Sequence, residues 1–224
     1  MESPSKAYNN NLKKAGTIRK EFTTMFNDIY VNNSRTKTGL GDTNEEEIVI
    51  SMGKFIPGKI YTYQYDPLLK NVLDWYDTRP VVLVNDVYQA GTGNWIVRGI
   101  NLNFLPEDIR AATLEQFYRI FESDINKSEE IAQIGKINLA ISKIVSFFKD
   151  WINVLSSFNS GGIGYQFAYR SYIVGRIKDP RYIEYQHWEI IPWLNPKELV
   201  GASIKQIHDE YWRDESELLK GPKK

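Results

Sequence analysis

Few residues of this 224-residue chain are of a type and spacing that could carry out chemistry. There are two histidines, His187 and His208, and no cysteine, which excludes a thiolate metal site and a cysteine nucleophile. Neither histidine stands in a His-x-His or His-Glu-x-x-His pattern, so we expect no metal site and no cofactor. The glycine clusters at 91–93 and 161–164 lack the Gly-Lys-Ser/Thr ending of a phosphate-binding loop and are typical of turns.

Acidic residues leave one enzymatic hypothesis open, that of a nuclease or hydrolase with a dispersed acidic site. Four aspartates fall near the ends of predicted strands: Asp66, Asp74, Asp77 and Asp86. Two carboxylates held close together could catalyse hydrolysis by acid–base chemistry. Aspartate is also favoured in turns, because its carboxylate accepts hydrogen bonds from nearby backbone N–H groups. We therefore predict that the protein is not an enzyme and has no catalytic residues.

Side chains suited to binding are more abundant than side chains suited to catalysis. The chain holds 14 Tyr, 10 Phe and 6 Trp, and such residues favour protein interfaces and can stack on nucleic-acid bases. Three tyrosines on one face of a predicted strand are candidates for partner binding: Tyr61, Tyr63 and Tyr65. A basic stretch near the C-terminus supplies four candidates for contact with phosphate, or with an acidic protein: Arg170, Arg176, Lys178 and Arg181.

The overall charge limits how nucleic acid could be bound. Lys plus Arg and Asp plus Glu each number 28, so the net charge is zero, whereas proteins that bind by neutralising phosphates usually carry a basic excess. Any nucleic-acid contact must therefore be local. No run approaches 18 apolar residues and the N-terminus has no apolar signal-peptide core, so we expect a soluble cytoplasmic protein with no membrane partner.

Residues 1–50 are predicted to form an arm that carries one short helix. The first forty residues hold seven basic and three acidic side chains, a local charge of +4, and the next ten contribute −4. Apolar residues recur at helical spacing: Ile18, Phe22, Met25, Phe26 and Ile29. Ile18, Phe22 and Phe26 are therefore further candidates for binding a partner. The alternative is that residues 1–50 form a flexible terminus.

Residues 51–220 are predicted to form a single α+β domain. Alternating and β-branched runs predict strands at 59–65, 80–85 and 94–105, with a hairpin turn at 89–93 between the last two. Three or four short strands separated by Gly and Pro indicate a small curled antiparallel sheet or partial barrel.

Helices are predicted to flank this sheet. One begins at Pro106, and the cleanest apolar stripe, with steps of three and four, predicts a long helix over 128–158. About thirty helical residues span about 45 Å, so part of the stripe could pack on a partner as well as on the sheet. The last quarter is predicted as a short helix or irregular segment at 167–177, a strand at 182–192 and a helix from Pro196.

Three ordered motifs resemble a family of tailed-bacteriophage virion proteins. They are Pro-Gly-strand-Tyr-Asp-Pro within 55–67, Tyr-Asp-x-x-Pro within 75–84, and Gly-Ile-Asn-Leu-Asn-Phe-Leu-Pro over 99–106. Such proteins are described as virion structural proteins, and some carry the label of a DNA end protector. This chain has Asn103 where the resembling proteins have histidine, so a role for that imidazole could not carry over.

The resemblance implies a non-enzymatic structural component of the virion, sited in the neck, tail or baseplate. It would bind neighbouring virion proteins in a symmetric ring or wedge, and would occupy the host cytoplasm before assembly. The alternative is a protector protein of the phage head that binds the DNA terminus. The nuclease or hydrolase is a further alternative.

Overall fold

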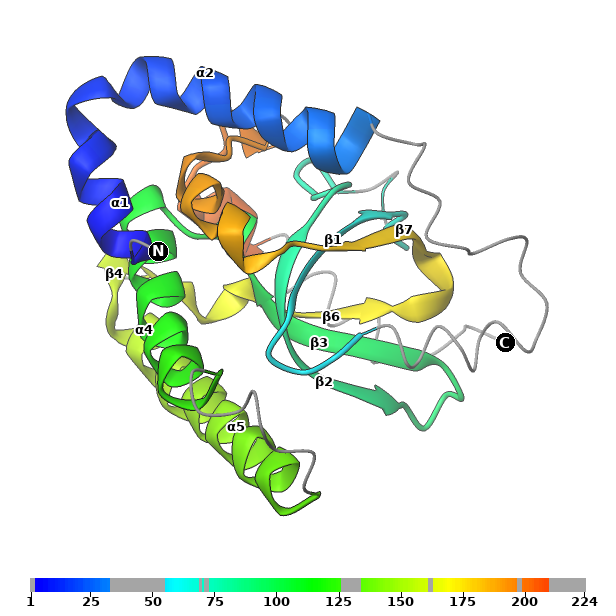
Figure 1. Cartoon of the computed structure of the whole chain (residues 1–224). Coiled ribbons are helices and arrows are strands. Elements are labelled where there is room, and N and C mark those ends of the chain that lie inside the picture. The colour runs from blue at the N-terminus through cyan, green and yellow to red at the C-terminus, as the bar shows by residue number, and fades with distance from the viewer. Residues whose placement is uncertain are drawn as a thin grey trace.

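An open five-stranded antiparallel sheet and a set of packed helices make up the α+β structure (Figure 1). The computed structural model describes residues 3–32, 55–68, 70, 73–125, 134–160, 163–196 and 199–209. The sheet strands are β1 Ile60–Tyr65, β2 Val81–Gln89, β3 Trp95–Asn101, β6 Tyr169–Ile173 and β7 Ile177–Tyr182, and β4 Asn159–Ser160 pairs separately with β5 Ile163–Gly164. The α-helices are α1 Pro4–Asn11, α2 Ala15–Phe26, α4 Glu107–Ile125 and α5 Ile134–Ser157. The predicted fold class is confirmed.

Short 3₁₀ and π segments connect these elements. They are η1 Leu12–Lys14, the π-helix η2 Asn27–Asn32, η3 Leu102–Phe104, η4 Tyr165–Ala168, η5 Val174–Arg176 and η6 Tyr185–Trp193.

The sheet is strongly curled. Its strand order is β6-β3-β2-β1-β7, and the predicted hairpin joins β2 to β3. Strands β1 and β6 are three positions apart, which is about 14 Å in a flat sheet. The rings of Tyr65 on β1 and Tyr172 on β6 nevertheless lie with centroids 5.0 Å apart. The sheet must therefore bend into a partial barrel, which stays open between the edge strands β6 and β7.

Alternating side chains on the strands supply two hydrophobic cores. On β1, Ile60 packs into the larger core with the helices, whereas Tyr61 and Tyr63 point into the smaller core inside the curl. On β2, Leu83 packs into the larger core and Val84 into the smaller one. The predicted alternation is confirmed, and the first four residues of each of these strands are buried on both faces.

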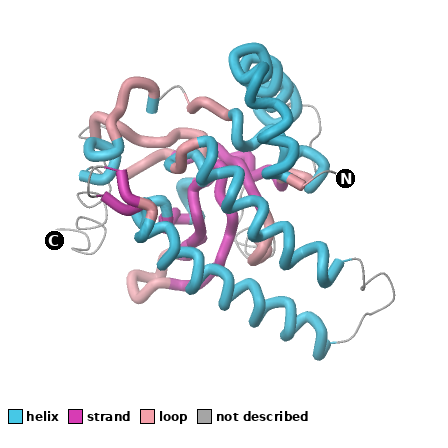
Figure 2. The backbone as a smooth tube through the Cα atoms, turned by 90° about the vertical axis from the view of Figure 1, so that its left-hand side faces the viewer, coloured by secondary structure: helices cyan, strands magenta, loops and turns pink. Residues whose placement is uncertain are grey.

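Helices α4 and α5 run side by side as a long antiparallel pair that extends beyond the sheet (Figure 2). Leu114 and Phe117 of α4 and Phe148 and Leu155 of α5 are buried in the larger core, as their spacing predicts. The 24 described residues of α5 span about 36 Å. The start predicted for this helix, at 128–133, lies outside the described residues. None of the described helices is both long and apolar enough to cross a membrane.

The N-terminal helices pack on the rest of the chain. We call the segment α1, η1, α2 and η2 the N-terminal layer; α1 contacts α4, and α2 lies across η6 (Figure 1). The predicted short helix corresponds to α2, and α1 is an addition that the sequence analysis did not predict. Because residues 33–54 lie outside the described residues, the division of the chain at residue 50 stays a prediction.

The C-terminal third differs from its prediction. The segment predicted as a short helix or irregular at 167–177 forms η4, β6 and η5, because β6 pairs with β3, far away in sequence. Most of the strand predicted at 182–192 is instead the 3₁₀ segment η6, and only Tyr182 belongs to a strand, β7. A buried arginine side chain donates to the last carbonyls of η6. Of the helix predicted from Pro196, residues 197–198 lie outside the described residues, Leu199 is in a 3₁₀ turn, and an α-helix is described over 204–209.

Candidate nucleic-acid interface

The four predicted phosphate contacts lie on the two edge strands and the short turn between them. Arg170 is on β6, Arg176 is in η5, and Lys178 and Arg181 are on β7. The three arginines each contact other groups of the same chain. The Arg170 guanidinium lies over the Phe104 ring, 5.4 Å from its centroid.

Arg176 ties η5 to the end of β1. Its Nε donates to the backbone oxygen of Asp66 over 2.5 Å, and its Nη2 donates to Asp66 Oδ2 over 3.2 Å and to the backbone oxygen of Pro67 over 3.3 Å. Lys70 also donates to the Asp66 carboxylate, over 2.6 Å, and this bond together with the nearby cations lowers the pKa of Asp66. Arg176 therefore links η5 to the segment that follows β1.

Arg181 is occupied in a similar way. Its guanidinium donates to Asp179 over 3.1 and 2.8 Å and to the backbone oxygen of Ile29 over 3.3 Å, where the N-terminal layer ends. Cations at the C-terminal end of a helix stabilise its unpaired carbonyls. Lys178 is the one member of the predicted set that is exposed and makes no hydrogen bond or ion pair with a described residue.

The predicted partner-binding tyrosines face the interior. Tyr61 and Tyr63 are buried in the smaller core, Tyr65 packs against it, and burial raises the pKa of Tyr63 well above its usual value. The hydroxyl of Tyr61 accepts a hydrogen bond from the backbone N–H of Ile56 over 3.2 Å. These rings therefore fill the curl of the sheet.

The apolar face of α2 also packs on the same chain. Phe26 is buried in the larger core, Phe22 packs against that core, and Ile18 is half-buried. Just beyond them, the Tyr30 hydroxyl forms a 2.7 Å hydrogen bond with His187 Nδ1 and accepts one from the backbone N–H of Glu184 over 3.3 Å. This docking turns the opposite side of α2 toward solvent.

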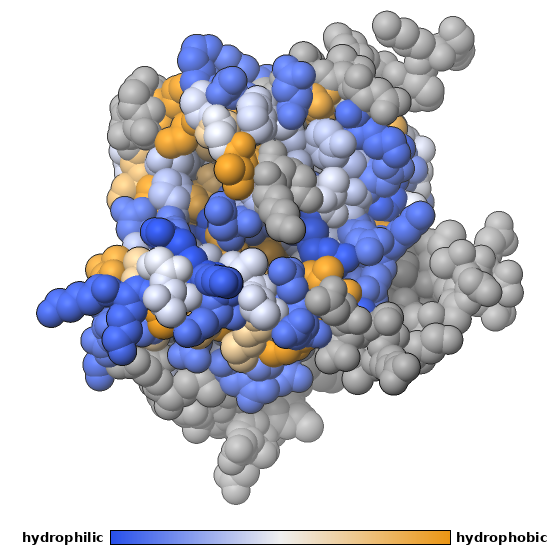
Figure 3. All heavy atoms as spheres, turned by 90° about the horizontal axis from the view of Figure 1, so that it is seen from above, coloured by the Kyte–Doolittle hydropathy of each residue, from blue (hydrophilic) through white to orange (hydrophobic). Residues whose placement is uncertain are grey.

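The N-terminal layer as a whole, α1 to η2, carries a basic excess at its exposed surface. The described residues 3–32 hold five basic side chains and two acidic ones, Glu21 and Asp28, a net charge of +3. All five basic residues are exposed: Lys6, Lys13, Lys14, Arg19 and Lys20. Viewed from above, the face that carries α2 is mostly hydrophilic, with separate hydrophobic residues (Figure 3). The sequence showed the charge excess, but only the packing shows that it is displayed on the surface.

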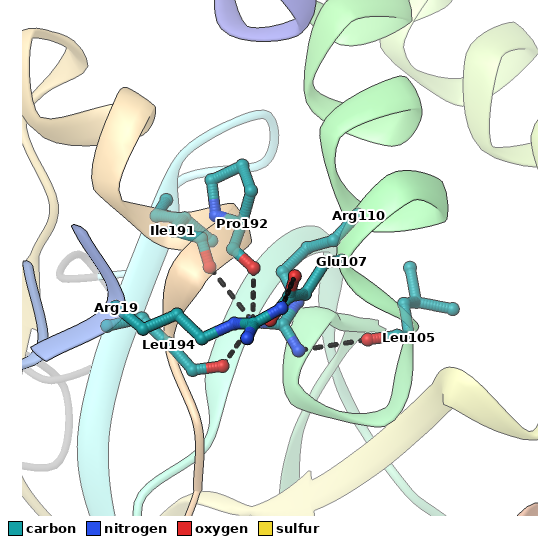
Figure 4. A network of polar contacts seen from close by, with 7 residues as sticks. All are labelled: Arg19, Leu105, Glu107, Arg110, Ile191, Pro192 and Leu194. Atoms are coloured by element: carbon teal, nitrogen blue, oxygen red, sulfur yellow. Dashed lines mark hydrogen bonds and ion pairs between the residues drawn. The ribbon is translucent and has the colours of Figure 1, made fainter. Parts of the chain in front are cut away.

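Two arginines fix the N-terminal layer and η6 to the start of α4 (Figure 4). Arg19 of α2 makes a two-pronged ion pair with Glu107, over 2.6 and 2.8 Å. Arg110, one turn further along α4, is 4% exposed. It donates to four backbone oxygens at 2.7 to 3.3 Å, those of Leu105, Ile191, Pro192 and Leu194. Burial lowers the pKa of Arg110 to about 10, so the guanidinium keeps its charge at neutral pH.

A buried carboxylate joins two of the resembling motifs. Asp77 Oδ2 accepts hydrogen bonds from the side-chain amides of Asn101 and Asn103, each over 2.9 Å, and Oδ1 accepts one from the backbone N–H of Arg79 over 3.0 Å. Asn101 also donates to the Tyr172 hydroxyl over 2.8 Å. At the position where the resembling proteins have histidine, Asn103 thus supplies a side-chain N–H donor.

Three of the acidic residues proposed for catalysis lie apart, each with different neighbours. Asp66 binds Arg176 and Lys70, Asp77 lies in the buried network, and Asp86 lies opposite Arg98 in the β2–β3 hairpin, where burial raises its pKa. Within the described part of the chain, no group of three or more His, Asp or Glu residues is arranged to hold a metal ion.

Comparison with known proteins identifies the family. Residues 9–154, about two-thirds of the chain, match the family described as Phage T4 terminal DNA protecting protein. No curated protein and no solved structure matches the chain. The match extends from α1 to the last turn of α5, so it includes η1 and α2, the motif strands, and Asp77 with Asn101 and Asn103. The chain therefore belongs to the family of phage T4 terminal DNA protecting proteins and is a bacteriophage protein.

Proposed function

We propose that this protein binds the ends of linear double-stranded DNA and shields them in the phage particle, without catalysing a reaction. The observation that carries the proposal is the family match over residues 9–154. It favours the DNA-terminus hypothesis over a neck, tail or baseplate role. The exposed basic side of the N-terminal layer supports it, because DNA binding by a protein of zero net charge requires a local cationic surface.

End binding is tested with duplexes that differ only in their ends. Fluorescence titrations would compare a linear duplex, the same duplex doubled in length, and a closed circle of the same sequence. We expect two binding sites per linear molecule at either length and much weaker binding to the circle. Affinity should fall steeply as salt rises, because each neutralised phosphate releases counterions. Equal affinity per base pair for the circle, or no binding at low salt, would exclude the proposal.

Shielding without catalysis is tested with an exonuclease. A saturating amount of the protein should slow digestion of an end-labelled linear duplex, and the same DNA incubated with the protein and Mg²⁺ alone should stay intact. Cleavage by the protein alone would support the nuclease hypothesis. In that event, variants of Asp66, Asp77 and Asp86 would show whether these acids are responsible.

Copy number separates the two phage hypotheses. A linear genome has two ends, so end protection predicts one or two copies in each particle. A component of a symmetric ring or wedge predicts about six or twelve copies. Quantitative mass spectrometry of purified particles, calibrated against the portal protein, distinguishes these cases.

A further inference from the structure

We propose that the phosphates of the DNA are contacted by the outer side of the N-terminal layer, through Lys13, Lys14 and Lys20. This assignment rests on the proposed DNA-binding function and names the surface that performs it. It replaces the four basic residues of β6, η5 and β7 that were predicted from the sequence, Arg170, Arg176, Lys178 and Arg181.

Availability of the cations is the first argument. Lys13, Lys14 and Lys20 are exposed and make no hydrogen bond or ion pair with a described residue. By contrast, the guanidinium groups of Arg176 and Arg181 donate to carboxylates and backbone oxygens of their own chain. A phosphate at η5 and β7 would have to displace these bonds, whereas a phosphate at η1 and α2 would displace no bond to a described residue.

Spacing is the second argument. Lys14 and Lys20 are six residues apart, which is about 9 Å along a helix. Successive phosphates of one DNA strand advance about 3.4 Å along the duplex axis, so this distance covers about three of them. Thr17 and Thr24 are exposed on the same side of α2 as Lys20, and threonine hydroxyls are common phosphate donors.

The distribution of charged side chains along the N-terminal layer indicates where the DNA backbone would lie. Lys13, Lys14 and Lys20 occupy η1 and the first half of α2, whereas Glu21 and Asp28 lie on the outer side further along. The negative charges of these two acids would repel the phosphates of DNA. The contact is therefore centred on η1 and the start of α2, and Glu21 marks its boundary.

Contacts with the rest of the chain hold this surface in place. This favours binding, because little conformational entropy of the backbone would be lost when DNA binds. Behind it, Phe26 and Tyr30 are buried in the core, and the Tyr8 ring packs on Trp193 with centroids 4.8 Å apart. Arg19, between the lysines, is anchored to Glu107. The lysines thus project from a rigid support.

A charge-neutralising variant and a matched control test this assignment. The variant combines Lys13→Gln, Lys14→Gln and Lys20→Gln, and the control combines Lys149→Gln, Lys178→Gln and Lys205→Gln, which are also exposed and remove the same charge. Binding to a linear duplex is measured over a salt series. We expect the slope of log affinity against log salt to fall by about 3 in the N-terminal variant and to stay unchanged in the control. Thermal unfolding should be the same for both.

A gain-of-charge variant provides a reciprocal test. Glu21→Lys should steepen the salt dependence by about 1 and tighten binding, since it extends the cationic surface. Wild-type affinity in the N-terminal variant, or an equal loss in the control, would overturn the assignment. If the wild type binds DNA without preferring ends and the N-terminal variant loses that binding, the end-binding function fails and the surface stands. A wild type that binds no duplex overturns both.

Discussion

The side-chain amide of Asn103 donates a hydrogen bond to Oδ2 of Asp77 over 2.9 Å, in the interior of the protein. Asn101 donates to the same oxygen, so one carboxylate holds the loop before β2 against the end of β3. Hydrogen bonds to a buried charged group contribute more than those between neutral groups. This relationship gives the motif residues a structural role.

Replacing Asp77 by alanine should therefore destabilise the fold. Asp77→Ala leaves the amides of Asn101 and Asn103 with fewer acceptors, and we expect a loss of about 3 kcal/mol in the free energy of unfolding. Asp74→Ala in the same loop is the control, because Asp74 is exposed. Urea unfolding measures both. Equal losses would contradict the role assigned to the network.

The buried Arg110 is expected to be the most sensitive charged residue of α4. Arg110→Ala removes the donor from four backbone oxygens and leaves a cavity, so we expect a loss of at least about 3 kcal/mol. Arg119→Ala on the same helix, where the side chain is 65% exposed, should change stability by less than about 1 kcal/mol. If Arg110→Ala does not fold, Arg110→Lys, which keeps the charge and fewer donors, should be intermediate in thermal unfolding. An Arg110→Lys protein as stable as wild type would contradict the role assigned to the four hydrogen bonds of Arg110.

Docking of the N-terminal layer should depend on Phe26. Phe26→Ala removes a buried ring from the larger core, at a cost of about 3 kcal/mol. Hydrogen exchange should then accelerate in residues 15–32 more than in α4. Met25→Ala is the matched control, since Met25 is 37% exposed. Unchanged exchange in the layer of the Phe26 variant would mean that other contacts hold it.

Stability should fall in alkaline solution through Tyr30. Burial raises the pKa of Tyr30 from 10.0 to about 12, because the phenolate is poorly solvated in the folded state. A raised folded-state pKa contributes stability that is fully present below pH 10 and is lost as the pH rises from 10 to 12. The contribution is on the order of 2 kcal/mol.

The variant Tyr30→Phe has no group that titrates at this position. Between pH 10 and 12 the unfolding free energy of the wild type should therefore drop more steeply than that of the variant. Denaturant titrations at fixed pH values measure the two slopes. Parallel slopes would show that Tyr30 is not the group responsible.

Local pattern was sufficient to predict much of the fold. Alternation predicted β1 with its tyrosines on one face, a glycine turn predicted the β2–β3 hairpin, and apolar spacing predicted α4 and α5. These features depend on residues close in sequence, where side-chain periodicity matches the geometry of the element. The C-terminal third could not be predicted in this way, because β6 and β7 form by pairing with β3 and β1, far away along the chain.

The sequence by itself determined the fold class, the zero net charge, the basic excess near the N-terminus and the motifs of a phage family. Tertiary structure alone decided which side chains are available for binding. Arg176 and Arg181 satisfy carbonyls and carboxylates, and Tyr61 and Tyr63 fill the curled sheet, because neighbours from distant segments meet them there. Lys13 and Lys20 meet no such neighbours among the described residues and remain at the surface. The residue type decides which groups a side chain can bind. The packing of the chain decides whether that side chain is already engaged by other residues of the protein.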